Sequence, residues 1–116
     1  MNDDKLFALS LEFAVKIIEL VKTLQEKKEF IISKQIGKSG TSIGANIREA
    51  KFAISKPEFI AKMQIALKES NETSFWLELL QKTGYLNLAD FKEFEKINVS
   101  IRAMLISALK TSKANA

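Results

Sequence analysis

The chain has 116 residues, a mass of 13.1 kDa and a net charge of +4, with 18 basic and 14 acidic side chains. This length predicts a single domain over residues 1–116, and its 47% apolar and 28% charged residues are typical of a folded domain. The absence of cysteine and histidine excludes disulfides, thiolate metal sites and the common nucleophile–base pairs. Composition therefore predicts a small helical protein without enzymatic activity or a cofactor.

Apolar residues recur every three or four positions in four segments, which predicts four helices. The segments are about 4–27, 29–52, 56–82 and 88–112. Short connections between helices of similar length predict an all-α, antiparallel up-down-up-down four-helix bundle.

The first segment carries two apolar stripes, although a bundle helix usually buries one. The second stripe consists of Phe7, Leu11, Ala14, Ile18 and Val21. Surplus apolar surface of this kind marks an interaction surface, which predicts a homo-oligomer. The alternative is that the wide stripe is buried inside a tight bundle.

The second segment contains three glycines, Gly37, Gly40 and Gly44, beside its isoleucine stripe. Glycine inside a helix costs about 1 kcal/mol, so a compensating close contact with another helix is expected. A loop at Gly37–Gly40 is the alternative, but the isoleucine spacing continues through it and favours a helix.

Residues that typically begin or end helices predict the remaining helix ends. Ser55 is expected to cap the third helix, with Pro57 in its first turn and Glu58 closing a capping box. Gly84 is expected to end that helix, and Asn87 to cap the fourth.

Positive charge gathers in residues 30–68, which contain seven basic and two acidic side chains, and again in the tail. On a helical wheel the cations of the second helix form one arc opposite the isoleucines: Lys34, Lys38, Arg48 and Lys51. Such an arc can contact phosphates, which are recognised by charge. The cations near the C-terminus that could extend it are Arg102, Lys110 and Lys113. The alternative is a solvated basic face.

Two further polar sets stand beside apolar stripes. Asn46 and Glu49 border the isoleucines, and we expect a carboxylate or hydroxyl of the third helix to face Asn46. Glu69, Glu72 and Trp76 share a face of the third helix. The acidic residues are expected to accept hydrogen bonds or pair with cations at a helix or subunit contact; a carboxylate metal site is the less favoured alternative.

The N-terminus lacks a basic signal-peptide region, and no apolar run approaches 18 residues. We therefore expect a cytoplasmic protein without a membrane partner.

Several ordered motifs resemble a known family. They are SIGANIREA at 42–50, FIAKM at 59–63, IALKESNET at 65–73, WLELL at 76–80 and TGY at 83–85. This set resembles the small four helix bundle protein family encoded within intervening sequences of bacterial 23S ribosomal RNA genes. The accessory variability protein of diversity-generating retroelements is a related branch.

The resemblance implies a four-helix bundle, a homopentameric ring and association with ribosomal RNA; in the retroelement branch it implies binding to nucleic acid and a reverse transcriptase. Asn46 and Glu49 match the family's Asn-Ile-x-Glu element, and Glu69, Glu72 and Trp76 match its acidic–aromatic element. This chain departs from the family pattern at Arg48, where a small residue is usual, and at Ala50, where glycine is usual.

Two functional hypotheses follow. The first is a homo-oligomeric, non-enzymatic bundle that binds RNA or DNA, in particular structured RNA, through the basic surface of the second helix. The second is a protein-interaction scaffold that uses the apolar and acidic face of the third helix and does not bind nucleic acid.

Overall fold

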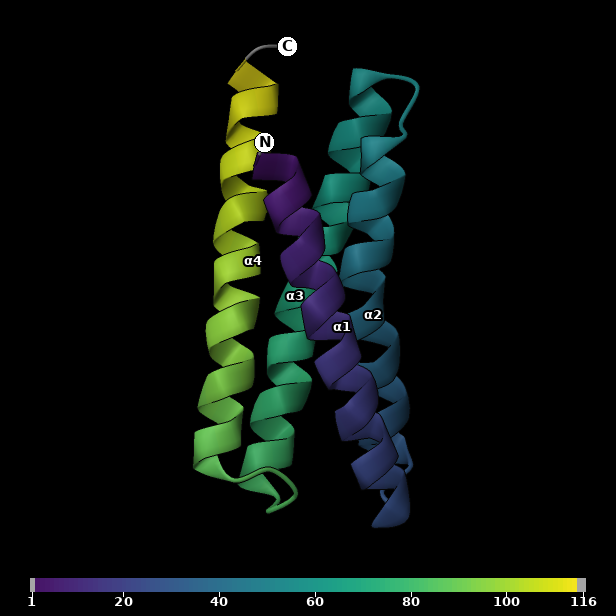
Figure 1. Cartoon of the computed structure of the whole chain (residues 1–116), viewed down its shortest axis with the longest axis vertical. Coiled ribbons are helices and arrows are strands. Elements are labelled where there is room, and N and C mark those ends of the chain that lie inside the picture. The colour runs from purple at the N-terminus through teal and green to yellow at the C-terminus, as the bar shows by residue number, and fades with distance from the viewer. Residues whose placement is uncertain (1, 115–116) are drawn as a thin grey trace.

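The computed structural model describes residues 2–114, with side chains from 5 to 114, and this part of the chain forms four helices. They are α1 (Asn2–Glu26), α2 (Ile31–Lys51), α3 (Lys56–Lys82) and α4 (Leu88–Ala114). The helices run antiparallel, up-down-up-down, in a bundle measuring 47 × 22 × 19 Å (Figure 1). Each helix packs on the next, and α4 returns to α1 through the smallest interface. The predicted four-helix bundle is confirmed.

Inward-facing residues of all four helices form one core. Phe13 at its centre meets Phe94 of α4 edge to face, with ring centroids 6.3 Å apart. The buried apolar residues are Leu6, Phe13, Ile17, Leu20, Leu24, Ile32, Ile36, Ile43, Ile47, Ala50, Met63, Ala66, Leu77, Leu80, Leu86, Ile101, Leu105 and Leu109. Burying one such large side chain stabilises a fold by about 1.5–3 kcal/mol, so this cluster is the main source of stability.

The α1–α2 interface depends on the glycines of α2, which is helical throughout. A Cβ added at Gly40 would lie 2.8 Å from Ile17 Cγ1, and one at Gly44 would lie 3.2 Å from Ser10 Oγ. The two helices therefore approach more closely than any larger residue at Gly40 would allow without a shift. The expected close contact is confirmed, and the loop alternative is wrong.

The α3–α4 interface contains a hydrogen-bonded polar seam, which we define as Ser70, Ser74, Glu95, Asn98 and Arg102. Fully buried Asn98 accepts from Ser70 Oγ at 2.7 Å and donates through Nδ2 to Ser70 O at 3.0 Å and Ser74 Oγ at 2.9 Å. Ser74 Oγ donates to Glu95 Oε1 at 2.7 Å and accepts from Arg102 Nη2. A buried amide with its partners in place fixes how α4 sits along α3.

The third and fourth helices begin at the side-chain caps that the sequence predicts. Ser55 Oγ accepts the Glu58 backbone N–H at 3.2 Å, and Asn87 Oδ1 accepts that of Asp90 at 2.8 Å. The Glu58 carboxylate accepts the N–H of Ile54 at 2.8 Å, one residue earlier than the N–H expected in a capping box.

Three predicted boundaries differ by two residues from the structure, and the first of them is the start of the first helix, which is Asn2 and not residue 4. The second helix begins at Ile31, not at 29, because Lys28 has φ +63° and the Glu29 carboxylate accepts the N–H groups of Ile32 and Ser33 at 2.6 and 3.0 Å. Glu29 thus caps this helix from outside it. The fourth helix continues past 112 to Ala114.

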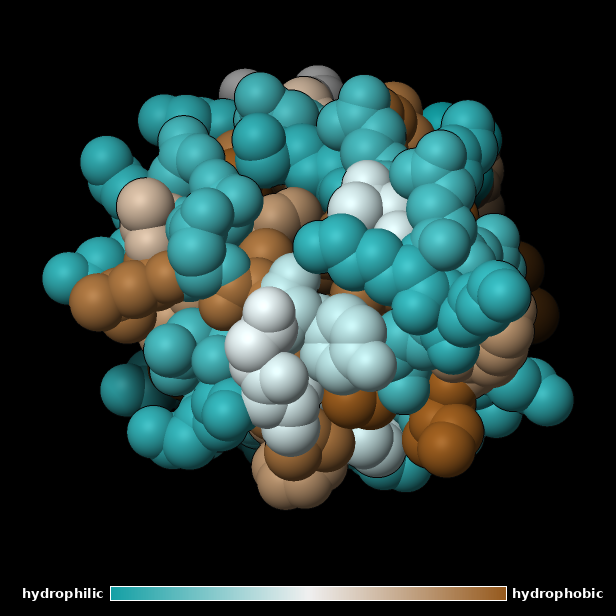
Figure 2. Space-filling model, turned by 90° about the horizontal axis from the view of Figure 1, so that it is seen from below, coloured by the Kyte–Doolittle hydropathy of each residue, from teal (hydrophilic) through white to brown (hydrophobic). Residues whose placement is uncertain are grey.

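Large apolar side chains are exposed at both ends of the bundle. The end with the α1–α2 and α3–α4 connections is mainly hydrophilic, with hydrophobic side chains at separate places around its rim (Figure 2). Phe30, Ile31 and Leu88 are exposed in these connecting regions. Phe52 and Ile54 are exposed in the α2–α3 connection, at the opposite end.

Candidate nucleic-acid interface

The four cations predicted to form an arc lie on α2, and all of them are exposed. Four isoleucines of α2 are buried in the core, and the opposite face of the helix is turned outward; they are Ile32, Ile36, Ile43 and Ile47. The arc consists of Lys34, Lys38, Arg48 and Lys51, and we call it the α2 basic face. At 1.5 Å per residue it extends for about 25 Å along the helix.

Within the α2 basic face, the side chains differ in their neighbours. The Arg48 guanidinium lies over the Phe7 ring of α1, 4.6 Å from its centroid, which orients the cation by a cation–π contact. Lys51 lies nearer the bundle end, where it lines a small pocket with Leu6 and Phe59. Arg48 and Lys51 therefore border α1.

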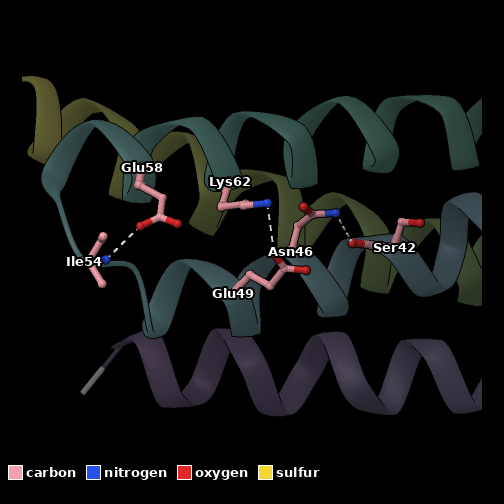
Figure 3. A network of polar contacts seen from close by, with 6 residues as sticks. All are labelled: Ser42, Asn46, Glu49, Ile54, Glu58 and Lys62. Atoms are coloured by element: carbon pink, nitrogen blue, oxygen red, sulfur yellow. Dashed lines mark hydrogen bonds and ion pairs between the residues drawn. The ribbon is translucent and has the colours of Figure 1, made fainter.

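Negative charge on α2 is confined to Glu49, which is engaged by a cation of α3. Lys62 Nζ lies 2.8 Å from Glu49 Oε1, and Figure 3 shows Lys62 reaching from α3 to this carboxylate. The hydrogen bond to Glu49, and then its charge, raise the pKa of Lys62. Glu49 is thereby partly neutralised beside the α2 basic face.

The hydrogen bond that Asn46 donates differs from the predicted one. Its Nδ2 donates to Ser42 O at 2.8 Å, one turn earlier on α2 (Figure 3). The predicted partner on the third helix is therefore wrong for this donor, because the backbone carbonyl four residues earlier is within reach of the amide. A different hydroxyl pair joins α2 to α3, Thr73 and Ser39, with oxygens 2.8 Å apart.

The acidic–aromatic set lies on α3 with all three side chains partly buried. Burial raises the pKa of Glu69, and the charge of Glu72 raises it further, while Lys68 and Lys38 act in the opposite direction. Trp76 Nε1 is buried and meets no acceptor among the described residues, and its ring contacts exposed Phe75 edge to face at 4.9 Å. Within residues 5–114, no three acidic side chains gather closely enough to hold a metal ion.

The three C-terminal cations do not join the α2 basic face. They lie on α4, and α2 and α4 occupy opposite sides of the bundle without contact in the described part of the chain (Figure 1). Lys110 and Lys113 are exposed there. Arg102 is half-buried in the polar seam, where Nη2 donates to Ser70 O at 3.3 Å, and its buried Nε finds no acceptor within the described residues.

Sequence reasoning missed the polar seam around Arg102. The available signal was Asn98, an amide that falls on the inward face of α4 between Phe94 and Ile101, together with Ser70 on the core face of α3. A polar residue at a core position requires a partner, and Arg102 follows Asn98 by one helical turn.

A shallow groove of about 300 Å³ follows the outer side of the α1–α2 interface. We call it the α1–α2 groove, and its lining is Phe7, Leu11, Ala14, Thr41, Gly44, Ala45 and Arg48. Leu11 is 51% exposed, and Val15 and Ile18 on the same helix are 54% and 42% exposed. Of the second apolar stripe predicted for this helix, Leu11 and Ile18 are exposed, whereas Phe7, Ala14 and Val21 are partly buried. No described helix is long and apolar enough to cross a membrane.

Comparison with known proteins gives two findings that agree with this geometry. Residues 2–107 match the family described as 23S rRNA-intervening sequence protein. Among solved structures, the chain is similar to a protein of unknown function from the S23 ribosomal protein family of Bacteroides thetaiotaomicron. The two are 51% identical with a TM-score of 0.93, over 95% of this chain and 99% of that one. A comparison with curated proteins gives no match.

Proposed function

This chain belongs to the 23S rRNA-intervening sequence protein family, and from that premise we propose that it is a cytoplasmic, non-enzymatic homo-oligomer that binds nucleic acid through the α2 basic face. We expect the ligand to be RNA, in particular structured RNA. The α2 basic face supplies the charge for phosphate contacts.

The observation that carries this proposal is the excess of positive charge on one helix face. Lys34, Lys38 and Arg48 are exposed, and the nearest carboxylate on their own helix, Glu49, is paired with Lys62. A row of cations without free carboxylates on the same helix attracts a phosphate backbone and releases its counterions. Binding of this kind weakens steeply with salt.

The apolar surface of α1 supports self-association. Leu11, Val15 and Ile18 are each about half exposed along one side of the helix and adjoin the α1–α2 groove. A second copy that buried this strip would remove it from water, and the family resemblance implies five copies in a ring. Sedimentation equilibrium tests this part of the proposal, and a monomer at micromolar concentration would contradict it.

The binding test is a fluorescence-anisotropy titration of purified protein with a structured RNA hairpin at two salt concentrations. The test variant replaces each cation of the face by glutamate: Lys34, Lys38, Arg48 and Lys51. The control variant makes the same charge change at exposed lysines elsewhere: Lys27, Lys28, Lys92 and Lys96.

We expect wild-type affinity to fall with salt and the test variant to lose binding, while the control keeps most of it. Loss of four phosphate contacts should reduce the salt slope by about 3. Equal losses in both variants would show that only net charge matters, and an unchanged test variant would remove the α2 basic face from the proposal. Circular dichroism checks that each variant remains helical.

The second candidate is a protein scaffold that uses α3. It is favoured by Phe75, which is 56% exposed beside Trp76, and by Ile65, which is 41% exposed on the same helix. Absence of wild-type binding to any nucleic acid at low salt, combined with loss of a co-purifying protein in the Phe75→Ala variant, would favour this candidate.

A further inference from the structure

The two residues that flank α2 are both phenylalanines, and both rings are in solvent. Phe30 precedes the helix and is 59% exposed, and Phe52 follows it and is 75% exposed. The backbone of Phe30 is in the α region, with φ −105° and ψ −15°, whereas that of Phe52, with φ −104° and ψ 15°, is outside it. Both residues adjoin α2 directly, so helical spacing gives the approximate side of α2 on which each ring lies.

Both phenylalanines fall in line with the cations of α2. Phe30 and Arg48 are 18 residues apart, as are Lys34 and Phe52. Eighteen residues make five complete turns of an α-helix, so each pair shares one side of α2. The outer face consequently has an aromatic ring at either end and cations between them, over about 33 Å.

This order of side chains fits a strand with unpaired bases. Cations hold phosphates, and exposed aromatic rings stack on bases whose faces are not covered by base pairing. Resting on the proposed function, we propose that the outer face of α2 binds an unpaired nucleic-acid strand, with Phe30 and Phe52 each stacking on a base and the cations between them contacting phosphates.

The residues between the rings argue against an apolar protein helix as the occupant. Thr41 and Ala45 are small, Lys34, Lys38 and Arg48 are charged, and the one large exposed apolar side chain between the rings is Ile31, next to Phe30. An amphipathic helix requires a continuous apolar stripe in the groove that receives it. A duplex is also a poorer fit, because its bases are stacked on one another and leave the rings without partners.

The test uses an unstructured twelve-nucleotide RNA carrying 2-aminopurine, compared with the same sequence as a duplex. Three double variants at Phe30 and Phe52 separate the contributions of the rings: both to Ala, both to Leu, and both to Tyr. Phe75→Ala is the matched control, since it removes an exposed aromatic ring from α3.

We expect the alanine variant to bind the single strand about 30-fold more weakly, as the loss of two base stacks predicts, with an unchanged salt slope. The leucine variant should lose as much, and the tyrosine variant and the Phe75→Ala control should bind like wild type. Binding by wild type should change the 2-aminopurine fluorescence through stacking, and the alanine variant should lose this signal. Duplex affinity should be the same in all variants.

Each contrary result has a distinct meaning. Wild-type affinity in the alanine variant, with strong salt dependence, would overturn the stacking proposal and leave the phosphate-contact function standing. Full affinity in the leucine variant, with loss in the alanine variant, would show that the strand needs only an apolar side chain at these positions, and would overturn the stacking proposal. No binding of either probe by wild type at low salt would overturn the proposed function and this inference together.

Discussion

The α1–α2 and α3–α4 interfaces join neighbouring helices of one bundle by opposite means. At the first, glycines bring α2 so close to α1 that a Cβ at Gly40 would overlap Ile17. At the second, the polar seam joins side chains of two helices around buried Asn98. Shape specifies the first interface and hydrogen bonding the second.

This difference determines which amino-acid substitutions each interface tolerates. A close-packed interface is sensitive to added volume, because neighbouring side chains have no room to move. A hydrogen-bonded interface is sensitive to the loss of one partner, because the remaining donor or acceptor stays buried without compensation. Two substitutions test this distinction, and a third concerns a partly buried carboxyl outside the polar seam. All are measured by urea denaturation at one fixed protein concentration, because self-association would make stability depend on concentration.

The largest effect is expected for Gly40→Val. Its Cβ would lie within 3.0 Å of both Ile17 Cγ1 and Cγ2, and Ile17 is fully buried. We expect the free energy of unfolding to fall by about 3 kcal/mol. Gly37→Ala is the control, because a Cβ there would meet only Val21 Cγ2, at 3.2 Å. Replacing this glycine by alanine also raises the helix propensity by up to about 1 kcal/mol. An unchanged denaturation midpoint for Gly40→Val would show that α1 can move away freely.

A smaller effect is expected for Asn98→Leu in the polar seam. Leucine fills similar space but leaves Ser70 and Ser74 without the partner they have in Asn98. We expect a loss of about 2 kcal/mol. Adding Ser70→Ala to Asn98→Leu should recover part of this loss, because the unpaired hydroxyl is then removed. If the costs of the two substitutions simply add, Ser70 and Asn98 do not act as a unit and the contrast between the interfaces is weakened.

The smallest effect concerns Glu69, a partly buried carboxyl outside the polar seam. Burial and the charge of Glu72 raise its pKa above the ordinary 4.5. The ionised carboxylate therefore opposes folding above the raised pKa, and this penalty shrinks as the pH falls through that pKa and vanishes below 4.5. We expect Glu69→Gln to be slightly more stable than wild type at pH 7 and equal to it at low pH. A less stable variant at pH 7 would mean that attraction to Lys38 and Lys68 outweighs burial.

The sequence by itself determined the four helices, their order and most of their ends. Periodicity was sufficient even across Gly37, Gly40 and Gly44, because the isoleucine spacing carries more information than the weak preference of single residues. It also determined the α2 basic face, since residues of one helix share a face by spacing alone. These features depend on residues close together in the chain.

Only the tertiary structure decided which side chains meet across helices. Arg102 follows buried Asn98 by one helical turn, but only the structure shows that it donates to Ser70 and Ser74 of α3. Asn46 has the spacing of a core residue facing α3, yet its amide bonds to Ser42 on its own helix. Spacing fixes the direction in which a side chain leaves its helix. What it meets depends on the position and rotation of the neighbouring helix, which are set by packing of the whole core.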